Sequence, residues 1–261
     1  MSPWVRDRWA IRASLIGLAV IAFLFLHLEL NRTFLYLFPP VRLPALSLLW
    51  VAACSLLLYA YVSGRNQGVL AMLLVFACVL LGKLFMIDMP SWRADFMFYA
   101  GPYSFLEATM RLLDFGIIIA FLFLGFRLLK EDVNAQAARQ VSGGAALVLL
   151  FIFLTLEVSS FLASFVPGLQ GGGVSILWSV FAIGCLLSGI WKDQRILRYV
   201  ALGLFAVVAW KVFFSDLAQL DQIYRIIAFM ILGVLVLCGS FIYLKYRSTF
   251  TSRAIAEETT S

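Results

Sequence analysis

A lysine and an aspartate interrupt the apolar sequence at one place, and the same pattern returns in the second half of the chain. The motif Lys-x-Phe-x-x-Asp runs from Lys83 to Asp88 and again from Lys211 to Asp216. An ammonium or a carboxylate at the centre of a membrane helix costs about 2.5–3.5 kcal/mol on insertion scales. Such groups therefore pair with one another or form a site for an ion or polar ligand.

Other polar and aromatic residues repeat at the same separation, which we call the first offset and define by Lys83 and Lys211. The further matches are Glu29 with Glu157, Ser47 with Ser175, Leu49 with Leu177, and Trp50 with Trp178. A shorter separation, the second offset, relates Glu107-x-x-x-Arg111 to Asp221-x-x-x-Arg225, Phe115 to Phe229, and Gly125 to Gly239. The second offset is shorter because the first copy has extra residues before its last segment. These matches indicate a tandem duplication.

The spacing of the charges predicts how they pair. Glu107 and Arg111 are four residues apart and share a face of a helix, as do their equivalents in the second copy. Lys83 and Asp88 are five residues apart, which places them on different faces of an α-helix. We therefore expect Glu29 to be the partner of Lys83.

The repeated charges support two interpretations, which the residues leave open. One is a salt-bridge network that holds the fold, for which the second copy supplies Glu157, Trp178, Lys211, Asp216, Asp221 and Arg225. The other is a ligand or partner site in the first copy. The candidate residues for that site are His27, Glu29, Arg32, Trp50, Lys83, Asp88, Glu107, Arg111 and Asp114.

Differences between the two copies favour the first as the location of a site. His27, Arg32 and Asp114 stand where the second copy has threonine, serine and alanine. The first copy also has an aromatic insert, residues 89–106, with no counterpart.

Several classes of chemistry find no support in the residue types. One histidine supplies neither the axial ligands of a haem nor the usual ligands of a catalytic zinc. The four cysteines lie in apolar segments and form no C-x-x-C pair. No phosphate-binding loop or hydrolase motif occurs, and the basic residues flank apolar segments rather than forming a nucleic-acid patch. We expect no metal, no cofactor and no nucleic-acid partner, and we identify no catalytic residue.

The composition is that of a membrane protein. Hydrophobic residues make up 63% of the 261 residues and charged residues 13%, whereas soluble domains are about half apolar and a quarter charged. Apolar runs of about 18 or more residues can each cross a bilayer as a helix. We predict an all-α integral membrane protein with eight spans, at 13–30, 45–63, 69–88, 109–128, 144–166, 174–191, 197–216 and 225–244.

The spans divide into two parallel four-helix repeats. We predict a cytoplasmic N-terminus (1–12), repeat 1 (13–128), a cytoplasmic linker (129–143), repeat 2 (144–244) and a cytoplasmic tail (245–261). This orientation places thirteen of the twenty Lys and Arg residues on the cytoplasmic side. The repeated charges then gather at the extracytoplasmic rim. Arg65–Gly68 and Gly171–Gly173 are predicted to be turns.

The repeated motifs resemble a known family. Ser-x-Leu-Trp, Lys-x-Phe-x-x-Asp and acid-x-x-x-Arg-x-x-x-Phe resemble the repeat of bacterial membrane proteins in the family of unknown function numbered 2339. The resemblance is strongest over residues 197–246. It implies repeats and a location in the cytoplasmic (inner) membrane, and it carries no catalytic residue. Members of that family are usually longer. We therefore expect this chain to be a two-repeat relative of them or to correspond to the C-terminal part of a longer member.

We expect a non-enzymatic membrane component that binds a partner protein, lipid or envelope precursor at its extracytoplasmic face. Its partners would be the lipid bilayer and other membrane or periplasmic proteins. One alternative is a small transporter with a site between the repeats. The other is a membrane enzyme that acts on a lipid-linked or glycan substrate through Glu29, His27 or Asp114.

Overall fold

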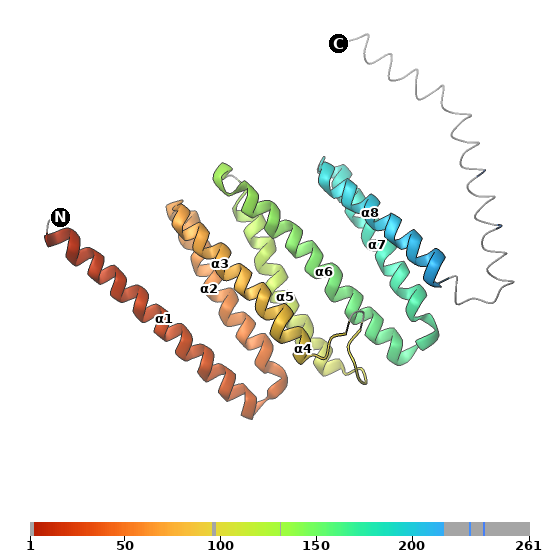
Figure 1. Cartoon of the computed structure of the whole chain (residues 1–261), viewed down its shortest axis with the longest axis horizontal. Helices are drawn as coiled ribbons and strands as arrows, with labels where there is room; N and C mark the ends of the chain where they lie inside the picture. The colour runs from red at the N-terminus through yellow and green to blue at the C-terminus, as the bar shows by residue number, and fades with distance from the viewer. Residues whose placement is uncertain (1–2, 96–97, 131, 217–229, 231–236, 238–261) are drawn as a thin grey trace, which may run out of the picture. The chain divides into compact units, whose positions relative to one another are not determined.

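A computed structural model describes residues 3–95, 98–130, 132–216, 230 and 237, and this part of the chain is helical (Figure 1). The longer helices are α1 (Pro3–Leu37), α2 (Arg42–Gly64), α3 (Gln67–Lys83), α5 (Phe105–Leu128), α6 (Gln136–Phe165), α7 (Gln170–Trp191) and α8 (Arg195–Lys211). The short elements are η1 (Pro39–Val41), η2 (Leu84–Asp88), α4 (Met89–Ser91), η3 (Val133–Ala135), η4 (Pro167–Leu169) and η5 (Val212–Asp216). The expected all-α class is confirmed.

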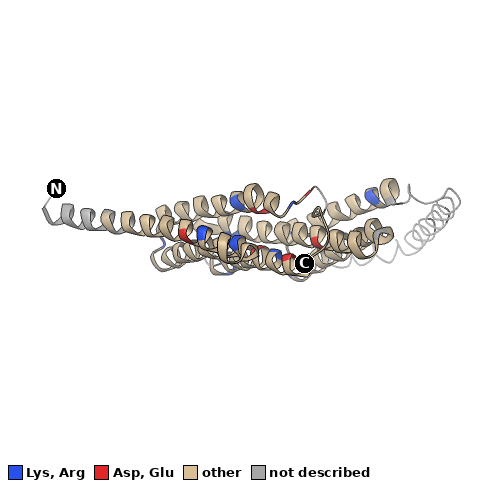
Figure 2. Cartoon of the chain, turned by 90° about the horizontal axis from the view of Figure 1, so that it is seen from below, with Lys and Arg blue, Asp and Glu red and all other residues tan. Residues whose placement is uncertain are grey.

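Seven helical segments of the described chain are long and apolar enough to cross a membrane. They are Gly17–Leu37, Pro39–Gly64, Gln67–Ser91, Phe105–Leu128, Val133–Phe165, Gln170–Trp191 and Arg195–Ser215. Charged residues are sparse along these helices (Figure 2). The seven segments overlap the first seven predicted spans, and the eighth, at 225–244, lies almost wholly outside the described residues.

The starts of four elements in each half of the chain follow the first offset. The separation that takes Lys83 to Lys211 also takes the starts of η1, α2, α3 and η2 to those of η4, α7, α8 and η5, respectively. Both η2 and η5 are π-helices, which are rare and occur mostly as short insertions.

By its internal contacts the chain forms two compact units, 1–177 and 178–261, whose boundary lies within α7. In unit 1, α5 packs against α2 and α6, α2 packs against α3, and α1 packs chiefly against α2 (Figure 1). Leu58, Leu84, Phe115 and Leu149 belong to its buried core. The first helix of the predicted second repeat, α6, thus packs onto the first repeat.

Of the two connections predicted to be turns, Arg65–Gly68 contains the turn and Gly171–Gly173 is helical. Arg65 ends α2 with a positive φ of 48°, and the Asn66 side chain accepts a hydrogen bond from Gly68 N at 2.8 Å, which confirms the turn. The prediction for Gly171–Gly173 was wrong, because these residues form the first turn of α7. A Cβ at Gly173 would lie 2.3 Å from Leu162 Cδ1 of α6. The glycine there allows a close approach of two helices.

Candidate functional site

Lys83 lies at the centre of a buried polar cluster between α2 and the end of α3. Its Nζ donates to Asp88 Oδ2 at 2.6 Å and to Ser47 Oγ at 2.8 Å. The π-helix η2 brings residues five apart onto one face, so the prediction that Lys83 and Asp88 diverge was wrong. The predicted partner, Glu29, is exposed on α1 and forms no ion pair with Lys83.

Asp114 of α5 adds a second carboxylate to this cluster. Asp88 and Asp114 are fully buried, and Lys83 is 7% exposed. The charge of Asp114 interacts with those of Lys83 and Asp88, and its carboxylate lies near Ser47 and Trp92. Within the described residues, neither oxygen of Asp114 and only one of Asp88 has a hydrogen-bond partner of good geometry. Two carboxylates thus face a single ammonium away from water.

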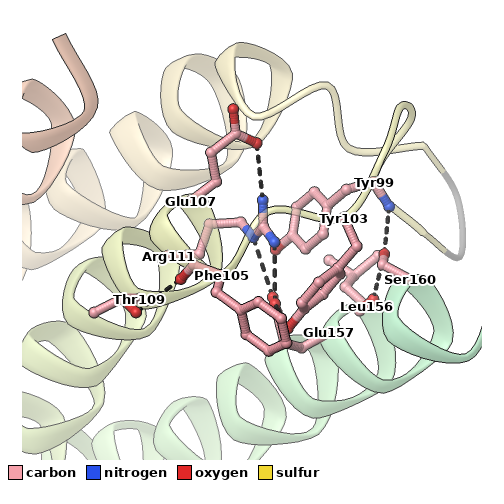
Figure 3. Close-up of polar contacts among 9 residues, drawn as sticks. All are labelled: Tyr99, Tyr103, Phe105, Glu107, Thr109, Arg111, Leu156, Glu157 and Ser160. Atoms are coloured by element: carbon pink, nitrogen blue, oxygen red, sulfur yellow. Dashed lines mark hydrogen bonds and ion pairs between the residues drawn. The ribbon is translucent and has the colours of Figure 1, made fainter. Parts of the chain in front are cut away.

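Arg111 forms a second buried cluster between α5 and α6 (Figure 3). Its guanidinium is 2% exposed and donates to both carboxylate oxygens of Glu157, at 3.1 Å and 3.0 Å. Glu107, one turn earlier on α5, lies 3.5 Å from it, which confirms the four-residue pairing. Two parallel hydrogen bonds fix the arginine in place and join the two predicted repeats.

Two tyrosines of the aromatic insert, Tyr99 and Tyr103, lie against the Arg111 cluster. Tyr99 is 6% exposed, and the centre of its ring lies 4.0 Å from the Arg111 guanidinium carbon. Its backbone N donates to Ser160 Oγ on α6 at 2.7 Å (Figure 3). The Tyr103 hydroxyl donates to Glu157 at 2.8 Å. Burial and this hydrogen bond to a carboxylate raise the pKa of Tyr103 to about 12.

Glu157, on the first helix of the predicted second repeat, therefore has its partner Arg111 in the predicted first repeat. The sequence comparison paired it with Lys211 by analogy with Glu29 and Lys83, and that analogy is wrong for Glu29. Lys211 belongs to the other compact unit, so its expected proximity to Glu157 stays a prediction. The sequence comparison noted the aromatic insert, the Ser47 match and the serine that corresponds to Arg32. It did not name Tyr99, Tyr103, Ser47 or Ser160 as site residues.

The remaining candidates of the predicted first repeat lie on α1 and at its contact with α2. His27 is half-buried, with its ring 6.2 Å from that of Trp50, and Phe23 packs edge-on against Trp50 at 5.0 Å. Trp50 is thus a packing residue of the α1–α2 contact. Glu29 and Arg32 are exposed on the opposite side of the helix. The structure brings Lys83, Asp88 and Asp114 together but leaves these two α1 charges outside both clusters.

The predicted network of repeat 2 is described only in part. Trp178 is 9% exposed, and Lys211 ends α8 just before the π-helix that closes at Asp216. Asp221 and Arg225 lie outside the described residues.

A third polar contact, which the sequence did not suggest, lies at the other end of unit 1. Asp132 accepts hydrogen bonds from the Tyr61 hydroxyl and, at 2.7 Å, from Arg65 Nη1. These hydrogen bonds from Tyr61 and Arg65 lower the pKa of Asp132 below its ordinary value. The contact ties the end of α2 to the connection before α6.

Metal-ligating side chains add no further site to the described chain. In this part no three His, Cys, Asp or Glu side chains are placed to hold a metal ion. A cavity of about 30 Å³ lies among Leu58, Leu70, Leu122 and Ser142, near the Asp132 end. Its lining is mostly apolar and it is separate from both charged clusters.

A family model matches part of the chain. The family model described as predicted membrane protein (DUF2339) matches residues 104–246, more than half of the chain. The matched region begins at α5 and so includes the α5–α6 contact. No curated protein and no solved structure matches.

Proposed function

The chain belongs to the DUF2339 family of predicted membrane proteins, and we propose that it is a non-enzymatic membrane component that binds a partner protein through α1. The surface concerned lies around Glu29, at the end of α1 that the charge distribution assigns to the extracytoplasmic side. The proposal rests on the two-repeat organisation, which the shared element starts support.

This proposal rests on one observation. Glu29 and Glu157 correspond by the first offset, but Glu157 is hydrogen-bonded to Arg111 and Glu29 is exposed. Glu157 accepts two hydrogen bonds from Arg111 and one from Tyr103. Glu29 is exposed on a helix long and apolar enough to span a membrane, and no ion pair is found for it among the described residues. A carboxylate on a lipid-facing surface is costly unless it is paired or reaches water. A protein partner that supplies a cation would satisfy it.

The surrounding surface fits a protein partner rather than a small ligand. Leu18, Ile21, Phe25 and Leu28 are each between 64% and 66% exposed. At about 100° per residue they lie on the same face of α1 as Glu29, opposite the face that packs on α2. This surface is flat and linear, which suits another helix.

The test is photo-crosslinking in native membranes with a reactive amino acid at position 25. The matched control is position 26, which is also exposed but points about 100° away. We expect a discrete protein adduct from position 25 that is at least fivefold weaker in the Glu29→Ala variant, and none from position 26. Lipid adducts alone from both positions would overturn the proposal.

A second candidate function is proton or cation binding, which the Lys83 cluster favours. Two buried carboxylates face one ammonium, and within the described chain neither oxygen of Asp114 has a hydrogen-bond partner of good geometry. A proton or a monovalent cation would balance the remaining charge, since unpaired buried charge costs several kcal/mol. The test compares the thermal stability of the wild type and Asp114→Asn across Na⁺, K⁺ and pH. A dependence that the variant lacks would support it; identical profiles would exclude it.

A further inference from the structure

We propose that the partner seated on α1 is a second copy of this chain, which contributes the segment predicted as its last span. This inference rests on the function proposed above and names the partner. Copies would join head to tail, with α1 of one copy against residues 221–239 of the next. The α5–α6 contact within one chain provides the template.

The template is a heptad-like row of side chains on α6. Ala146, Leu149, Phe153 and Leu156 are between 2% and 7% exposed. The ring of Phe153 lies 5.3 Å from that of Phe115 on α5. One turn further along α6, Glu157 binds Arg111. An apolar row and a terminal ion pair thus define how a first helix of one repeat packs on the last helix of the preceding repeat.

The same row exists on α1 but is uncovered. By the first offset, Ala146, Leu149, Phe153, Leu156 and Glu157 correspond to Leu18, Ile21, Phe25, Leu28 and Glu29. The four apolar residues are 64%, 65%, 66% and 66% exposed, respectively. The aromatic ring and the carboxylate that make the directional contacts of α6 are both retained. Lipid alone would not select a glutamate at this position, since leucine would serve better.

The chain contains one further segment that matches the α5 side of the template. By the second offset, Arg225 corresponds to Arg111 and Phe229 to Phe115. Gly239 corresponds to Gly125. A Cβ at Gly125 would lie 3.7 Å from Ser142 Oγ of α6. The segment offers an arginine to Glu29 and a phenylalanine to Phe25 at the same spacing of four residues. Its charge and ring pattern complement the open face of α1.

The arrangement of unit 1 favours the last span of a second copy, rather than that of the same chain, as the partner of α1. α1 packs chiefly on α2, α2 packs on α5, and α5 packs on α6, so α2 and α5 lie between α1 and α6 (Figure 1). The two first helices, α1 and α6, thus lie on opposite sides of unit 1, and the chain continues from α6, on the side away from α1. An α1 face and a last span that match as α6 and α5 do, but that belong to different copies, form a heterologous interface.

The test is disulfide crosslinking in membranes between two differently tagged full-length chains in a cysteine-free background. One chain carries Phe25→Cys and the other Phe229→Cys. The matched positive control is a single chain with Phe115→Cys and Phe153→Cys, the template pair. We expect an adduct with both tags, formed to at least half the extent of the control.

Charge exchange provides a second measurement that does not depend on the cysteine positions alone. Glu29→Arg should reduce the two-tag adduct at least fivefold, because an arginine then faces Arg225. Adding Arg225→Glu to the partner chain should restore at least half of it. Restoration shows that the variants fold and that the two residues meet.

The outcomes separate this inference from the function on which it rests. A disulfide found only within a chain carrying both cysteines, and never between chains, would show that the chain's own last span covers α1. A photo-adduct from position 25 with a different protein would keep the proposed function and overturn the second copy. Failure of both assays would overturn both proposals.

Discussion

Glu157→Ala tests whether the α5–α6 ion pair supports the fold. The substitution leaves the Arg111 guanidinium, 2% exposed, without its bidentate partner. Breaking a buried ion pair costs about 3–5 kcal/mol. Glu107 remains 3.5 Å from the Arg111 guanidinium. Because Glu107 is 54% exposed, its ion pair with Arg111 offsets at most about 1 kcal/mol of this loss. The expected loss of stability is therefore about 2–4 kcal/mol, or roughly 5–12 °C in Tm for a chain of this size.

The assay is thermal unfolding in detergent, followed by size-exclusion chromatography with fluorescence detection. The matched control is Glu29→Ala at the repeat-equivalent position, which should shift Tm by less than about 2 °C in detergent-separated monomers because Glu29 is exposed. Replacing Arg111 and Glu157 together by leucine should recover most of the loss, since no charge is then stranded. A shift below about 2 °C for Glu157→Ala, or a double variant as unstable as the single one, would refute the reasoning.

Three further predictions follow from the other contacts. Lys83→Ala should reduce the yield of folded protein severalfold, because it strands two buried carboxylates; an unchanged yield by membrane fractionation would contradict this. The lowered pKa of Asp132 contributes stability that is present above its ordinary value of 3.8 and is lost as pH falls through the folded-state pKa. Asp132→Asn should therefore flatten the acid limb of a Tm–pH curve, and an unaltered limb would exclude that role. Gly173→Ala should lower Tm, since its Cβ would lie 2.3 Å from Leu162, whereas Gly172→Ala meets nothing within 4 Å and should not; equal effects would contradict the close helix contact.

The two charged clusters show when the spacing of two residues predicts whether their side chains lie on one helix face. Glu107 and Arg111 were predicted to share a face, and they do, because α5 is a regular α-helix there. Lys83 and Asp88 were predicted to diverge, because the same rule was applied to a segment that is a π-helix. Spacing rules apply only when the helix type is known. The local residue pattern did not indicate that the α-helix changes to a π-helix at Leu84.

The sequence by itself determined the helical membrane class, the positions of seven long apolar helices in the described chain, and the first offset that the element starts follow. These features depend on local composition and on repetition along the chain, which are read without knowing any long-range contact. Only the tertiary structure decided that Glu157 binds Arg111 and that two tyrosines of the aromatic insert lie against this pair. The reason is that α6 packs on α5, so the partner of Glu157 lies on the helix that precedes α6 in the chain. Glu29 on α1 is exposed, whereas Glu157 on α6 is paired, and the sequence around the two glutamates does not show this difference.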